Sequence, residues 1–105
     1  GVPFAVHDVD CAGRVTWVNQ VQCRLFGFSH EQMLGRPVWD FAPTAHRPQR
    51  CEEIERALRG AGEPGGREWS YEDASGTCRV LQVQDTRLTN ADGEVIGLRF
   101  FLLDA

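Results

Sequence analysis

The chain has 105 residues and a net charge of −4, from 15 acidic and 11 basic side chains, and every basic residue is an arginine. This length fits one domain, expected over residues 1–105, that buries roughly 65% of the surface of its unfolded chain. The acidic balance argues against a nucleic-acid partner, and no apolar run approaches the roughly 18 residues that cross a bilayer, so we expect a cytoplasmic domain without direct membrane contact.

We expect the chain to begin with a β-hairpin. Residues 4–9 and 15–18 are both rich in β-branched and aromatic side chains, and residues 10–13 between them have the composition of a turn. This pattern predicts two adjacent antiparallel strands.

Two short helices are expected next. Asn19 can cap the first helix, because its side-chain oxygen can accept a hydrogen bond from a free backbone amide, and Gly27 can end it in a left-handed conformation. Ser29 and Gln32 have the spacing of a capping box for the second helix, which Gly35 is expected to stop.

Two more helical pieces follow in the prediction. Residues 38–41 are apolar but poor helix formers, so tertiary packing must hold them in a helical turn. The second piece is better founded, with Thr44 as its expected cap and Pro48 tolerated in its first turn. One face of this helix is apolar and is expected to lie on an apolar surface; its residues are Cys51, Ile54 and Leu58.

Three strands complete the expected fold. Residues 60–66 are rich in glycine and are expected to be the most flexible part of the chain. Strands are then predicted over residues 67–72, 78–88 and 95–103. The order of two strands, four helical pieces and three strands predicts an α+β fold, in which short helices pack on one face of a five-stranded antiparallel sheet.

A series of short motifs runs through the chain in a fixed order. They are Asp10, Gly13 and Arg14; Asn19; Gly27, Phe28 and Ser29; Glu31; Leu34, Gly35 and Arg36; Gly76 and Thr77; and residues 92–97 before the last strand. Each motif is short, but the ordered set resembles a PAS domain over nearly the whole chain. The resemblance implies a PAS-like sheet whose last strand is central.

The resemblance also implies a place for a ligand, between the sheet and the third and fourth helices. The residues that could line such a pocket are Trp39, Phe41, Cys51, Ile54, Trp69, Tyr71, Leu81, Val83 and Phe100. Most of them are expected to be ordinary core residues, because a small domain must bury its aromatic side chains somewhere. Arg67 and Arg99, on two of the strands, are expected on an exposed face.

Cofactors known in the family can be compared with the residues of this chain. Photosensing flavin domains carry a reactive cysteine where this sequence has Val38, so covalent flavin chemistry is not expected. Oxygen-sensing haem domains place an axial histidine where this chain has Arg50, so haem is not expected in that register. His46 or Cys51 could still bind iron in another register.

The cysteines and the remaining histidines give no further site. The cysteines at 11, 23, 51 and 78 have no zinc-ligand spacing, and we expect reduced thiols that pack as small buried side chains. His7, in the first strand, and His30, early in the second helix, have no recognisable partner in the sequence.

No catalytic triad, phosphate-binding glycine loop or facing pair of carboxylates is apparent, so we do not expect an enzyme. The resemblance implies a sensor module of a signal-transduction protein, such as a histidine kinase of a two-component system or a cyclic-dinucleotide enzyme, with an output domain after Asp104. Two hypotheses stay open. The module either binds a small organic molecule between sheet and helices, or is a ligand-free module that forms a homodimer through its N-terminal segment or outer sheet face.

Overall fold

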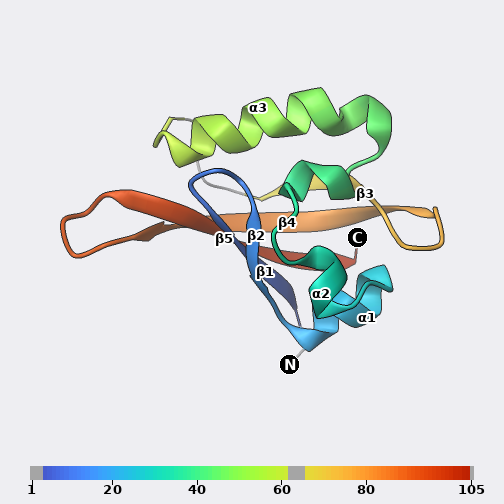
Figure 1. The fold of residues 1–105 in the computed structure, drawn as a ribbon. Coiled ribbons are helices and arrows are strands. Elements are labelled where there is room, and N and C mark those ends of the chain that lie inside the picture. Colours follow the sequence, from blue (N-terminus) through green and yellow to red (C-terminus); the bar gives the residue numbers. More distant parts are fainter. Residues whose placement is uncertain (1–3, 62–65, 105) are drawn as a thin grey trace.

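Five strands form one antiparallel sheet in the order β2-β1-β5-β4-β3, in the computed structural model, which describes residues 4–61 and 66–104 (Figure 1). The strands are β1 (Ala5–Asp10), β2 (Val15–Val18), β3 (Arg67–Glu72), β4 (Cys78–Thr89) and β5 (Val95–Asp104). The last strand lies between β1 and β4, which confirms the expected topology. Residues 62–65 of the stretch that was expected to be flexible lie outside the described residues.

The helical segments lie between β2 and β3 in the chain and pack on one face of the sheet. They are α1 (Gln20–Phe26), α2 (His30–Met33), the 3-10 turns η1 (Val38–Phe41) and η2 (Thr44–His46), and α3 (Arg47–Leu58). Figure 1 shows α3 lying over the sheet, where it contacts β5. Of the helices that the structure describes, none is long and apolar enough to cross a membrane.

The caps of the first two helices are confirmed. The Asn19 side chain accepts a hydrogen bond from the Gln22 amide at 2.9 Å, and Gly27 ends α1 in the left-handed region with φ of 73°. Ser29 and Gln32 form both bonds of the capping box of α2. Local hydrogen bonding therefore sets these boundaries, as the sequence predicts.

The start of α3 differs from the prediction. The helix begins at Arg47, after His46, and Thr44 instead begins the short turn η2. With Thr44 as the cap, its carbonyl would need the amide hydrogen of residue 48, and Pro48 has none. Proline therefore moves the start of the helix forward, so that Pro48 lies in the first turn.

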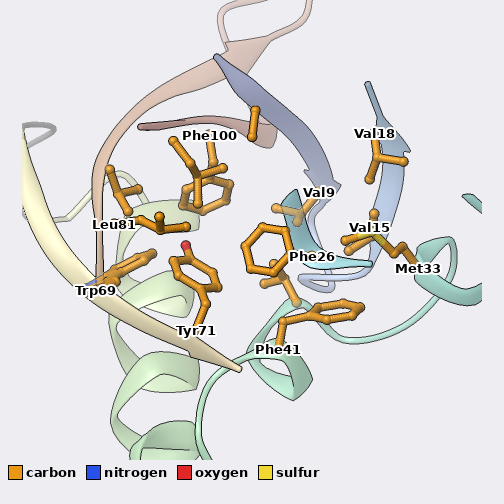
Figure 2. Close-up of a cluster of buried hydrophobic side chains, with 14 of the residues drawn as sticks. Val9, Val15, Val18, Phe26, Met33, Phe41, Trp69, Tyr71, Leu81 and Phe100 are labelled. Carbon is orange, nitrogen blue, oxygen red and sulfur yellow. The ribbon is translucent and has the colours of Figure 1, made fainter. Parts of the chain in front are cut away.

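The core lies between the sheet and the helices. Inward-facing residues alternate along the strands, and on the central strand they are Leu98, Phe100 and Leu102, each at most 1% exposed. Phe26 of α1, Met33 of α2 and Ile54 of α3 cover them from the helical side with at most 1% exposure. Figure 2 shows several of these side chains meeting in one cluster.

Arg67 of β3 and Arg99 of β5 lie on opposite faces of the sheet. Arg99 is on the outer face, as expected, and binds both carboxylate oxygens of Asp8 at 2.7 and 2.8 Å. The prediction for Arg67 was wrong, because it shares the helical face with Trp69 and pairs with Asp85 at 3.1 Å. Alternation along β3 places residues 67, 69 and 71 on one face, and the apolar members of that set must point inward.

None of the cysteines is fully buried, contrary to expectation. All four are free thiols; Cys11 and Cys78 are exposed, and Cys23 and Cys51 are half-buried. Cys11 lies in the turn between β1 and β2, and Cys78 is the first residue of β4, so neither reaches the core. The Cys23 Sγ atom lies 3.5 Å from Nδ1 of His30, which gives that histidine a partner that the sequence did not indicate.

A buried histidine on β1 also has a partner. The Nδ1 atom of His7 lies 2.8 Å from Oε1 of Gln22 on α1, and the ring stacks on Phe100 with 4.8 Å between centroids. Because the glutamine oxygen is an acceptor, Nδ1 carries the proton, and Nε2 is left buried without a partner among the described residues. Burial lowers the pKa of His7 to about 4.

We expect this histidine to make the stability of the fold depend on pH. The unfolded chain takes up a proton near the ordinary histidine pKa of 6.5, whereas the folded chain does not until about pH 4. Lowering the pH from 7.5 to 5 should therefore reduce the free energy of unfolding by about 2 kcal/mol, as measured by urea titration. His30→Gln, on an exposed residue, should keep this loss, and His7→Phe should remove most of it. Equal stability of the wild type at both pH values would contradict the assignment.

Candidate functional site

Most of the predicted pocket residues form the packed core. Six of the nine side chains are at most 4% exposed: Phe41, Ile54, Tyr71, Leu81, Val83 and Phe100. Figure 2 shows Tyr71, Leu81 and Phe100 close together, with Trp69 beside them. The structure therefore brings these residues together as core, which is the role that the sequence favoured for most of them.

Trp39 lies apart from that group. Its ring covers Gly13 in the turn between β1 and β2, where a β-carbon would collide with the indole. Gly13 also has a φ of 76°, which favours glycine, so the turn and the tryptophan fit each other. Trp39 is half-buried against the core and has a structural role in holding η1 to the hairpin.

Cys51 also lies outside the group. Its half-buried thiol donates a hydrogen bond to Oε1 of Glu55, one turn later on α3, at 3.1 Å. Burial and the neighbouring carboxylate raise the pKa of Cys51 to about 11. An axial ligand to haem iron would have to be the thiolate, so the environment of this cysteine does not suit that role. Val38, at the position of the flavin-reactive cysteine, is a buried core residue.

A cavity of about 250 Å³ lies between the start of α3 and the edge strand β3. Its lining comes from η2, α3 and β3: His46, Gln49, Arg50, Glu53, Glu68, Trp69 and Ser70. Trp69 is the one predicted pocket residue among them. The lining is mostly polar, which distinguishes this cavity from the apolar core beside it.

The central residue of this cavity is Arg50. Its side chain extends from α3 to β3, and the residue is only 5% exposed. The guanidinium carbon lies 4.2 Å from the ring centroid of Trp69 and 5.1 Å from that of Tyr71, and Nη2 donates to the Ser70 carbonyl oxygen at 3.1 Å. Two aromatic rings and one backbone oxygen therefore position the cation.

Arg50 differs in its electrostatic surroundings from Arg67, which also lies on the helical face of the sheet. Arg67 has the carboxylate of Asp85 at 3.1 Å, whereas no carboxylate in residues 4–61 and 66–104 forms an ion pair with Arg50. Burial lowers the pKa of Arg50, and the attraction of Glu53 only partly opposes that effect. A buried cation without an ion-pair partner is costly, so this residue is not explained by fold stability alone.

Sequence reasoning noted Arg50 only as the residue that replaces a haem ligand. One signal could have indicated its burial, since it precedes Ile54 by four residues and the two therefore share a helix face. Arginine is rarely placed on a buried face, so the apolar residues of this helix do not by themselves indicate that Arg50 is buried. Its aromatic neighbours come from β3, and their approach to α3 depends on tertiary structure.

Comparison with known proteins agrees with this architecture. A family model described as PAS fold matches residues 1–105. The PAS domain of an HTR-like protein from Haloarcula marismortui superimposes with a TM-score of 0.81 at 24% identity, covering 100% of this chain and 84% of that one. A PAS domain from Colwellia psychrerythraea gives a TM-score of 0.86 at 19% identity, covering 97% and 86%.

A third similar structure is described as VqmA bound to DPO, and a further solved structure of VqmA names Vibrio cholerae as its source. The structure with DPO superimposes with a TM-score of 0.80 at 19% identity and covers 99% of this chain but 52% of that one. These structural matches concern the fold. A search of curated proteins by sequence gave no match.

Proposed function

Because the chain belongs to the PAS family, we propose that it is a regulatory module that binds a small organic molecule in the cavity between α3 and β3. The observation that carries this proposal is the buried cation of Arg50, which is held by Trp69 and Ser70 without a carboxylate. A structure with a similar fold is described as VqmA bound to DPO, and this likeness supports the proposal of a bound ligand here.

The module would belong to a cytoplasmic signal-transduction protein, such as a histidine kinase or a cyclic-dinucleotide enzyme, and would have no catalytic activity of its own. A ligand between α3 and β3 would favour one arrangement of the helix against the sheet. Hydrogen bonding continues from β3 through β4 to β5, which ends at Asp104. An output segment after Asp104 could follow this change. The free energy by which the ligand shifts the equilibrium is at most the difference between its binding free energies for the two arrangements.

Nuclear magnetic resonance titration with a library of small organic molecules tests this proposal. The three tryptophans report on three places, since Trp69 lines the cavity, Trp39 covers the hairpin turn and Trp17 lies on the outer face. We expect hits to shift the Trp69 indole signal and the amide signals of residues 46, 47 and 49–53, with the indole signal of Trp17 as the internal control. A library without hits, or hits confined to the outer face, would exclude the proposed site.

The second candidate function is a ligand-free dimerisation module, and the outer sheet face favours it. Phe4 and Trp17 are each 47% exposed and Val80 is 49% exposed, and Phe4 packs edge-on against Phe101 at 6.3 Å between centroids. Apolar side chains on an open sheet face suit a homodimer contact. Sedimentation velocity over a concentration series should then give a dimer that Trp17→Ser weakens, and a monomer at all concentrations would exclude this candidate.

A further inference from the structure

The hydrogen-bonding capacity of Arg50 is largely unused. A guanidinium group has five N–H donors, and the bond from Nη2 to the Ser70 oxygen is the one hydrogen bond that Arg50 makes within the described residues. The aromatic rings of Trp69 and Tyr71 lie against the guanidinium at 4.2 and 5.1 Å from their centroids and cannot accept the remaining in-plane hydrogens. The free N–H groups therefore remain available to a ligand.

From this arrangement we infer that the ligand of the cavity is a small organic acid whose carboxylate is bound by Arg50. This inference rests on the proposed function. Arginine and carboxylate groups are planar and form two parallel hydrogen bonds, so a carboxylate would use the unpaired donors and supply the missing opposite charge. A neutral ligand would leave the buried cation without an ion-pair partner.

The rest of the lining restricts the acid further. A volume of about 250 Å³ holds roughly eight water molecules, which suits a ligand of about ten non-hydrogen atoms. Glu53 and Glu68 also line the cavity, and they would repel a second carboxylate but accept a hydrogen bond from a hydroxyl or ammonium group. Trp69 adds an aromatic wall. The lining therefore selects a monocarboxylate with a hydrogen-bond donor at some distance from the acid group.

Calorimetric titration with matched compounds tests the inference on the wild-type protein. The probes are 4-hydroxybenzoate and 4-hydroxyphenylacetate, their neutral amides 4-hydroxybenzamide and 4-hydroxyphenylacetamide, and the dicarboxylate terephthalate. We expect at least one acid to bind at least about 30-fold more tightly than its amide, since removing one member of a buried charge pair has effects of this size. Terephthalate should bind more weakly than 4-hydroxybenzoate, because its second carboxylate would face Glu53 or Glu68.

Substitutions then test whether Arg50 is the group that binds the acid. Arg50→Gln should lose the preference for acid over amide, and Arg50→Lys should keep part of it because lysine retains the charge but not the fork of donors. Arg56→Gln is the matched control, because it removes the same charge from an exposed residue of the same helix, and it should change affinity by less than about twofold. The comparison of acid with amide in the wild type applies even if a variant at position 50 does not fold.

The failure of this inference can be distinguished from the failure of the proposed function. Amides or other neutral hits that bind as tightly as the acids, in the wild type and in Arg50→Gln alike, would overturn the carboxylate assignment and leave a ligand-binding module. Preference for terephthalate would overturn the restriction to monocarboxylates. Absence of binding by every acid, amide and library compound at millimolar concentration would overturn both.

Discussion

Gly97→Ala is expected to destabilise the fold by at least about 3 kcal/mol. Gly97 lies in the central strand, opposite Asp10 of β1 and Leu88 of β4. A β-carbon there would collide with the carbonyl oxygen of Val9 and lie 3.3 Å from its carbonyl carbon. Both groups belong to backbone that is paired in the middle of the sheet, so neither can move without breaking hydrogen bonds. Thermal unfolding should show a fall on the order of 12 °C or more.

Gly66→Ala is the matched control for this substitution. Among residues 4–61 and 66–104, no atom outside its chain neighbours lies within 4 Å of a β-carbon built on Gly66, and its backbone is not in the left-handed region. The same chemical change should therefore be neutral there, or slightly stabilising through the unfolded chain. If both variants unfolded at the wild-type temperature, the close contact between β1 and β5 at Gly97 would be wrong.

Phe100→Ala is expected to cost about 3–5 kcal/mol, the range for removing a fully buried aromatic ring. Phe100 is 1% exposed and lies against His7 and Trp69, with centroids at 4.8 and 5.9 Å. The ring therefore links the N-terminal strand to the strand beside the cavity. Chemical denaturation gives the change in the free energy of unfolding directly.

The neighbouring residue provides the control. Phe101 is on the same strand but on the outer face, half-buried against Phe4. Phe101→Ala should cost about 1 kcal/mol, because the site is open to solvent and no closed cavity forms. Similar losses in the two variants would contradict the assignment of faces on β5, and with it the position of the core.

The parts of the fold that depend on local chemistry could be predicted from the sequence. Asn19 and Ser29 cap helices through bonds to amides three residues away, and Gly27 ends α1 through a backbone conformation that few other residues adopt. The start of α3 at Arg47 could also be predicted from local chemistry. Pro48 has no amide hydrogen, which excludes Thr44 as the helix cap. The order of strands came from the resemblance to a family.

The candidate site was harder to predict, because it depends on contacts between distant segments. The resemblance to PAS domains predicts that Trp39 lies near the ligand. In the structure its ring covers Gly13, which is far away in the sequence. Arg50 lies beside Trp69 only because α3 packs next to β3 in the folded chain. The sequence pattern predicts that aromatic residues are buried. It does not distinguish those that fill the core from Trp69, which borders the cavity.

The most direct test of a small-molecule sensor is native mass spectrometry of the freshly purified protein, beside a denaturing spectrum of the same sample. A bound molecule should appear as extra mass in the native spectrum, disappear on denaturation and be absent from Arg50→Gln. The Arg56→Gln variant should retain it. A native spectrum at the bare polypeptide mass, unchanged after incubation with the small-molecule fraction of a cell extract, would contradict ligand binding at this cavity.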